Sequence, residues 1–200
     1  MLIPISRRDF VKLTGAVTPG AIAGTEFMPY AEGAAAASNE NGKILYGDRE
    51  IPLLYRADCC VIGGGPAGAA AAVSAAKKGA KTVLVERGIA LGGLQTLGLV
   101  LPFMPTFAPD SDTPYVQSVK TKMREHGIEV SDGVTGYGWT NPEVLTLVYD
   151  ELCAEAGTEI LYHTVLVDTI MEQKKIRYCV VQTIAGLAAV SADVFIDASG

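Results

Sequence analysis

The fold of this chain is decided by residues 59–68, which read CCVIGGGPAG. Four residues of strand length are followed at once by a glycine turn, and an alanine-rich stretch over residues 69–78 then shows helical spacing and stops at Gly79. A strand, a glycine turn and a helix in this order are typical of the first unit of a dinucleotide-binding fold. The backbone N–H groups at the start of the helix, and the positive end of its dipole, are expected to bind a pyrophosphate group.

Each glycine of this turn has its own expected task. Gly63 permits the tight turn, Gly65 lets the pyrophosphate approach the backbone, and Gly68 lets the helix pack closely on the strand. A second strand over residues 81–85 ends at Glu86, whose carboxylate can accept hydrogen bonds from both ribose hydroxyls of an adenosine. A lone glycine turn can arise by chance in an ordinary βαβ unit, so the second strand and its acid are what indicate dinucleotide binding.

Composition excludes several classes of protein. The 200 residues are 49% hydrophobic and 19% charged, which is enough apolar material for one globular core. The net charge is -6 and the Lys and Arg residues are scattered, so no nucleic-acid partner is expected. The four cysteines lack C-x-x-C or C-x-x-H spacing, so we expect no metal site and interpret all four as core thiols.

Residues 1–37 are interpreted as a twin-arginine export signal. Residues 6–12, SRRDFVK, match the pattern S-R-R-x-F-x-K at every fixed position, and residues 35–37 supply an A-x-A processing site. The mildly apolar stretch over residues 13–24 is too short and too broken by glycine and proline to be a stable membrane span. The alternative is an accidental basic N-terminus, which Glu26 favours. We expect an exported protein, periplasmic or at the cell surface, that collects its nucleotide cofactor before leaving the cytoplasm.

The remaining chain divides into a linker and one domain. Residues 38–56 are expected to be a polar linker and a short arm, and residues 57–200 a nucleotide-binding domain. Within it, residues 101–141 are expected to form an irregular insertion near the cofactor, because prolines crowd its first part. Helices are expected over residues 115–126 and 142–156, the second capped by Asn141 with proline at its first position.

The pattern of the last part of the chain predicts an antiparallel segment between two strands of the parallel sheet. Residues 159–167 form a β-rich run, residues 168–191 show the strand and turn pattern of an antiparallel meander, and residues 194–197 return to the sheet. The predicted fold class is therefore α/β: a Rossmann-like domain with a parallel sheet and an antiparallel β-meander.

With these features the chain resembles the FAD-dependent oxidoreductase family, which has the glutathione-reductase-like FAD/NAD(P)-binding fold. The matching pieces are residues 61–68 and 83–87, the glycine pair at 92–93 and the terminal DASG at 197–200. The resemblance implies FAD as the cofactor, redox chemistry carried by the flavin, and a small-molecule substrate or electron-transfer partner. The cofactor-binding residues that it implies are Gly63, Gly65, Pro66, Ala67, Gly68, Glu86, Arg87, Gly92, Gly93, Leu94, Val165, Ala198 and Gly200.

Some of these roles come from the resemblance alone. It places Gly92, Gly93 and Leu94 along the diphosphate or ribityl part of FAD, and it gives Val165 a main-chain contact to adenine. The terminal Ala-Ser-Gly matches the start of a late A-[ST]-G-D motif whose acid the chain lacks. We therefore expect a truncated product or a fragment without the second half of the usual flavoprotein.

The spacing of the reactive side chains indicates no catalytic residues, because no Ser/His/Asp, Cys/His or paired-carboxylate constellation can be read from it. Two alternatives to an FAD-dependent oxidoreductase stay open. One is a nicotinamide-binding reductase domain, which the meander and the glycine pair disfavour. The other is a non-catalytic nucleotide-binding remnant.

Overall fold

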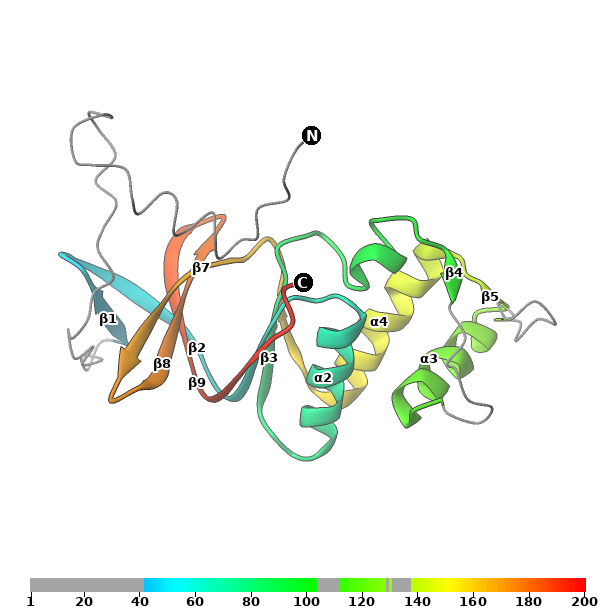
Figure 1. Ribbon diagram of the computed structural model, residues 1–200, viewed down its shortest axis with the longest axis horizontal. Coiled ribbons are helices and arrows are strands. Elements are labelled where there is room, and N and C mark those ends of the chain that lie inside the picture. The colour runs from blue at the N-terminus through cyan, green and yellow to red at the C-terminus, as the bar shows by residue number, and fades with distance from the viewer. Residues whose placement is uncertain (1–41, 104–111, 129, 131–137) are drawn as a thin grey trace, which may run out of the picture. The chain divides into compact units, whose positions relative to one another are not determined.

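The computed structural model describes residues 42–103, 112–128, 130 and 138–200, so the expected export signal lies outside the described residues. Helices and strands alternate over residues 49–161, and only strands follow (Figure 1). The elements are β1 (Lys43–Tyr46), β2 (Arg49–Ile62), α2 (Pro66–Lys77), β3 (Thr82–Val85), the 3-10 helix η1 (Gly93–Gln95), β4 (Pro102–Phe103), α3 (Pro114–Glu125), β5 (Gly138–Trp139), α4 (Pro142–Ala156), β6 (Glu159–Leu161), β7 (Val165–Glu172), β8 (Lys175–Thr183) and β9 (Gly186–Asp197).

The main sheet joins a parallel part to an antiparallel part, with strand order β6-β3-β2-β9-β8-β7. Cys60 at the centre of the parallel part lies opposite Val83 of β3 and Phe195 of β9. In the antiparallel part, Cys179 of β8 lies opposite Val190 of β9. The predicted fold class, a parallel sheet with a β-meander, is confirmed.

Two apolar cores cover the two faces of the parallel strands. Helices α2 and α4 pack on one face of the parallel strands, and residues of the meander pack against the other face (Figure 1). The first core includes Val61, Ala72, Leu84, Leu145 and Leu152, and the second includes Cys60, Val83, Cys179, Val181 and Val190. All four cysteines are free and buried, which confirms their interpretation as core thiols.

The helices begin and end close to where the sequence predicted. The Asn141 side chain accepts hydrogen bonds from the N–H groups of Glu143 and Val144, both at 3.0 Å, and so caps α4. Gly157 ends the same helix in the left-handed conformation, with φ of 77°. None of the helices in the described ranges has the length and apolar character needed to cross a membrane.

The first long strand differs from its predicted position. We expected a strand from Cys59 and a linker and arm over residues 38–56, but residues 43–56 form β1 and the first part of β2. From Ile51 to Ala57, alternate side chains turn inward while those between them are exposed. β1 pairs with residues 49–52 of β2 and β9 pairs with it from Leu53 onward, which holds this segment in the sheet. Residues 38–41 lie outside the described part of the chain.

Two other strand boundaries were wrong. The β-rich run expected over residues 159–167 is broken after Leu161, because the chain turns at His163, whose φ is 51°. Val165 therefore begins the first strand of the meander. The segments expected separately at 187–191 and 194–197 are one continuous strand, β9, which pairs with β8 in its first half and with β2 further on.

Part of the predicted insertion over residues 101–141 is regular. It contains α3, whose N-cap Thr113 accepts a hydrogen bond from the N–H of Val116 at 3.3 Å. It also contains the short antiparallel pair β4 and β5. Residues 104–111, 129 and 131–137 of the insertion lie outside the described residues.

Candidate cofactor site

The turn between β2 and α2 has the geometry that its glycines predicted. Gly63 has a φ of 99°, and a Cβ there would lie 2.5 Å from the carbonyl oxygen of Ala198. A Cβ on Gly68 would overlap the carbonyl oxygen of Gly63. Gly63 is thus required for the turn, and Gly68 for the close approach of the helix to the turn and to Ala198.

Gly65 differs from both of these glycines because the space beside it is open. Its backbone is extended, with φ of -66°, and a Cβ there would have no atom within 4 Å. It is the N-cap residue of α2, Pro66 and Ala67 follow in the first turn, and no side chain caps the helix. The start of α2 therefore presents bare backbone beside an open space, which is the arrangement that an anionic group requires.

The carboxylate of Glu86 is held against this turn by two backbone groups. Its Oε2 accepts a hydrogen bond from the N–H of Gly64 at 2.6 Å, and its Oε1 accepts one from the N–H of Gly88 at 2.5 Å. Each carboxylate oxygen can accept more than one hydrogen bond, so both retain capacity for a ligand hydroxyl. The neighbouring Arg87 is exposed.

The second glycine pair lies directly on the first turn. The N–H of Gly92 donates to the carbonyl oxygen of Gly64 at 2.8 Å, and a Cβ on Gly93 would lie 3.2 Å from the Cα of Gly65. Gly92 has a φ of 95°, which favours glycine. Leu94 follows with its side chain 69% exposed. Two segments separated in the sequence thus form one surface.

Two further predicted segments reach the same edge of the sheet. The N–H of Ala198 donates to the carbonyl oxygen of Ile62 at 2.8 Å, which places the end of β9 beside the first turn, and Gly200 follows two residues later. The N–H of Thr164 donates to the carbonyl oxygen of Glu86 at 3.0 Å. Val165, the next residue, therefore lies close to the end of β3. The structure therefore brings all the sequence-predicted segments to the carboxyl ends of β2, β3 and β9.

Sequence reasoning missed a buried tyrosine that supports the second turn. Tyr149 of α4 donates its hydroxyl hydrogen to Oε1 of Gln95 at 2.6 Å. A Cβ on Gly92 would lie 2.8 Å from Cε2 of the same ring. Burial raises the pKa of Tyr149, so its hydroxyl stays protonated and able to donate. No local pattern indicates this role, because the partner Gln95 lies in a loop 54 residues away in the sequence.

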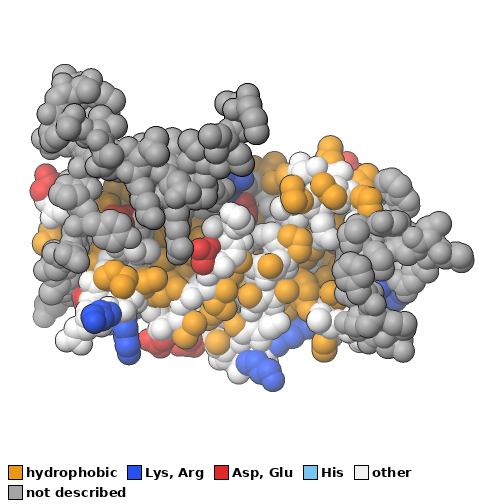
Figure 2. Space-filling view, in the orientation of Figure 1, with side chains coloured by type: hydrophobic (Ala, Val, Ile, Leu, Met, Phe, Trp, Pro, Cys, Tyr) orange, Lys and Arg blue, Asp and Glu red, His pale blue; other side chains and the backbone are white. Residues whose placement is uncertain are grey.

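Exposed apolar side chains surround the second turn. Figure 2 shows hydrophobic atoms gathered over η1 and the loop that follows it. The residues that contribute are Ile89, Leu94, Leu97, Leu99 and Val100, all at least 47% exposed. An apolar patch of this kind is typical of a surface that contacts a ligand or another part of a protein.

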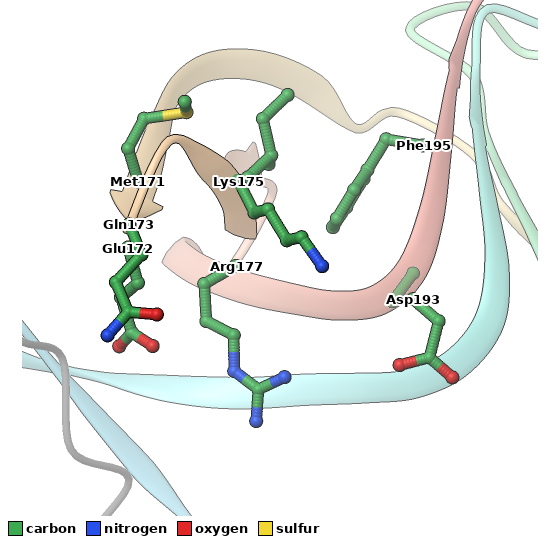
Figure 3. Close-up of a pocket in the computed structure, with 9 residues that line it drawn as sticks. Met171, Glu172, Gln173, Lys175, Arg177, Asp193 and Phe195 are labelled. Atoms are coloured by element: carbon green, nitrogen blue, oxygen red, sulfur yellow. The ribbon is translucent and has the colours of Figure 1, made fainter.

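A separate open hollow of about 920 Å³ lies on the meander. Its labelled side chains come from β7, β8, β9 and the turn between β7 and β8 (Figure 3). It is lined by Met171, Glu172, Gln173, Lys175, Ile176, Arg177, Ala192, Asp193 and Phe195, none of which was predicted as a site residue. In the described part of the chain, no cluster of three His, Cys, Asp or Glu residues could hold a metal ion.

The strand order and the glycine turns at one sheet edge define a Rossmann-type dinucleotide-binding domain with a β-meander. Sequence comparison makes the class more specific. The chain belongs to the FAD-dependent oxidoreductase family, whose family model matches residues 58–200. FAD is the cofactor of this family.

Individual relatives support the same assignment. The chain is 32% identical over 162 residues to thiamine thiazole synthase from Methanococcus vannielii, a match that covers 74% of this chain and 57% of the relative. It is 35% identical over 98 residues to dihydrolipoyl dehydrogenase from Manduca sexta, covering 49% of this chain and 19% of the relative. The chain thus spans less than two thirds of the length of these relatives.

Solved structures share the fold at low sequence identity. Thermovibrio ammonificans THI4 superposes with a TM-score of 0.54 at 18% identity, covering 72% of this chain and 58% of that one. The 3-ketosteroid-Δ4-(5α)-dehydrogenase of Rhodococcus jostii RHA1 gives 0.52 at 16% identity, covering 72% and 46%. At these sequence identities, the structural similarity shows a shared fold and nothing more.

Proposed function

We propose that residues 57–200 bind FAD across the two glycine turns and serve a flavin-dependent oxidoreductase reaction. The observation that carries this proposal is the open space beside Gly65, at the point where three separate segments meet. The N–H of Gly92 bonds to Gly64, and the N–H of Ala198 bonds to Ile62, so both segments border the start of α2. A Cβ on Gly65 would enter the space that a diphosphate needs, which is the fit expected of such a site.

Each part of the dinucleotide has a matching group in this arrangement. The diphosphate takes the backbone of Gly65, Pro66 and Ala67, where α2 begins without a side-chain cap. The carboxylate of Glu86 accepts hydrogen bonds from the adenosine ribose, since the N–H of Gly64 already holds it toward the turn. Its negative charge disfavours a ribose 2′-phosphate.

The remaining predicted residues complete the site in the proposal. Gly92, Gly93 and Leu94 border the ribityl side, Val165 contacts adenine through its main chain, and Arg87 lies exposed beside Glu86. Ala198 and Gly200 border the diphosphate at the end of β9. FAD, when bound, supplies the hydride or electron transfer, while the chain binds and orients it. The substrate is a small molecule or an electron-transfer partner.

Titration of the purified chain with FAD tests the proposal, with NADH titrated in parallel. We expect Gly65→Ala to weaken FAD binding at least tenfold without lowering the thermal midpoint, because the new methyl group contacts only the cofactor space. Gly127→Ala is the matched control. Gly127 ends α3 with a φ of 77°, so its substitution should lower the thermal midpoint and leave FAD affinity unchanged. Saturable NADH binding without FAD binding would favour the nicotinamide-dependent alternative.

We further propose that the protein is exported by the twin-arginine route. The support is the SRRDFVK pattern at residues 6–12 and the small residues at 35–37. This route carries folded proteins, which suits a chain that must take up a nucleotide cofactor in the cytoplasm.

A further inference from the structure

Tyr149 occupies an unusual place between the helical core and the candidate cofactor site. Its side chain is 2% exposed and belongs to the core under α2 and α4, yet its hydroxyl reaches Gln95 in η1. Gln95 is itself partly exposed and lies two residues beyond Gly93. The buried Tyr149 hydroxyl thus holds the Gln95 side chain, which belongs to the second glycine turn beside the candidate cofactor site.

The ring of Tyr149 makes a second contact with the same turn. This ring and the side chain of Thr96 both crowd the position of a Cβ on Gly92, which would be 2.8 Å from Tyr149 Cε2 and 2.5 Å from Thr96 Cγ2. The Thr96 hydroxyl donates in turn to the carbonyl oxygen of Leu91 at 2.5 Å. No side chain fits at Gly92, and its left-handed backbone packs directly against the Tyr149 ring and Thr96.

The turn from Gly92 to Gln95 is hydrogen-bonded to the first glycine turn, between β2 and α2. The N–H of Gly92 donates to the carbonyl oxygen of Gly64, and the N–H of Gly64 donates to Glu86. A displacement of Gly92 would consequently shift both groups proposed to contact the dinucleotide, the glycine turn at the diphosphate and Glu86 at the ribose. Tyr149 connects helix α4 to this series of contacts through its hydrogen bond to Gln95 and the position of its ring beside Gly92.

We propose that Tyr149 is a positioning residue for FAD: its hydroxyl fixes Gln95 and its ring supports Gly92, so that the turn from Gly92 to Gln95 is held ready for the cofactor. The inference rests on the proposed FAD-binding function. A turn that is already ordered loses little freedom when the ligand binds, and a turn released from its support has to be ordered by the ligand at a cost in affinity.

A neighbouring tyrosine provides a matched control. Tyr115 of α3 stacks on Tyr149, with ring centroids 6.4 Å apart, and its buried hydroxyl has no hydrogen-bond partner within the described residues. Removing that hydroxyl changes the same aromatic pair without touching the turn. Tyr149→Phe and Tyr115→Phe therefore differ mainly in the bond to Gln95.

The experiment combines these two variants with Gln95→Met and the double variant Tyr149→Phe/Gln95→Met. FAD dissociation constants are measured by flavin fluorescence, and the visible circular dichroism of the bound flavin is recorded. We expect Tyr149→Phe and Gln95→Met each to raise the dissociation constant about two- to tenfold and to change the flavin dichroism. The double variant should bind FAD no more weakly than the single variant with the larger loss, because both substitutions remove the same hydrogen bond between Tyr149 and Gln95. Tyr115→Phe should match the wild type.

Amide hydrogen exchange of the cofactor-free chain separates the inference from the proposed function. Tyr149→Phe should speed exchange in residues 92–99, and Tyr115→Phe should not. If the wild-type chain binds no FAD, the proposed function fails, and exchange still decides whether Tyr149 holds the turn. If the wild type binds FAD and Tyr149→Phe binds it equally well, the positioning role is wrong. Additive losses in the double variant, or a loss explained by a lower thermal midpoint alone, would also overturn it.

Discussion

The carboxylate of Glu86 and the backbone N–H of Gly64 are joined by a hydrogen bond of 2.6 Å between the ends of two neighbouring strands. The same carboxylate accepts a second bond from the N–H of Gly88. Glu86 therefore fixes the glycine turn from one side, and in the proposed FAD site its remaining lone pairs accept hydrogen bonds from the cofactor.

Glu86→Gln should affect both the glycine turn and FAD binding. An amide has one acceptor oxygen and one donor nitrogen, so either Gly64 or Gly88 would face a second donor in place of an acceptor. We expect a loss of about 1–3 kcal/mol in the free energy of unfolding, together with weaker FAD binding. Urea unfolding and FAD titration measure the two effects. Asp48→Asn, at an exposed carboxylate, is the control and should change neither.

Gly68→Ala should disrupt the fold itself, in contrast to Gly65→Ala. The added methyl group at Gly68 meets the Gly63 carbonyl oxygen and approaches the Cβ of Ala198, so α2 has to move away from the sheet. We expect a destabilisation of at least about 2 kcal/mol by urea unfolding, since overpacking has costs of this order. Equal stability of the two alanine variants would contradict the close helix packing assigned to Gly68.

Stability should decline in alkaline solution. Burial raises the pKa of the Cys153 thiol to about 12, whereas an unfolded cysteine titrates near 8.5. The folded state therefore keeps a proton that the unfolded state has lost, and this contribution to stability is present below about pH 8.5 and lost as the pH rises toward 12. Burial also raises the pKa values of Tyr115 and Tyr149, which adds to the decline above about pH 10.

Urea midpoints measured between pH 8 and pH 10.5 test this decline. The slope for one such group is at most about 1.4 kcal/mol per pH unit. Cys153→Ala should reduce the slope between pH 8.5 and 10, while lowering stability at pH 8 through lost packing. An unchanged slope in that variant would show that Cys153 does not titrate differently in the two states.

Export should depend on the two arginines near the N-terminus. Replacing Arg7 and Arg8 together by lysine keeps the charge but removes the pair that the twin-arginine receptor recognises. We expect the full-length precursor to accumulate in the cytoplasm, as detected by cell fractionation and immunoblotting. The matched control is Lys77→Arg with Lys78→Arg, at the end of α2, which should leave export unchanged. Export of the double lysine variant at the wild-type level would indicate another route.

Features that depend on neighbouring residues could be predicted from the sequence. The glycine turn over residues 63–68, the strand that ends at Glu86 and the Asn141 cap of α4 follow from local chemistry, because a turn, a cap or a strand end is specified within a few residues. The meander could also be predicted, since short strands separated by turns leave a periodic pattern.

Features that depend on pairing between distant segments could not be predicted and are seen only in the folded domain. β2 extends back to Arg49 because β1 and β9 pair with it, and β9 is continuous because one strand serves both the meander and the parallel sheet. The contact of Gly92 with Gly64, and the support of that turn by Tyr149, join residues whose separation in the chain carries no local signal. Hydrogen bonding and close packing between distant segments determine these contacts, so they arise only when the whole domain is assembled.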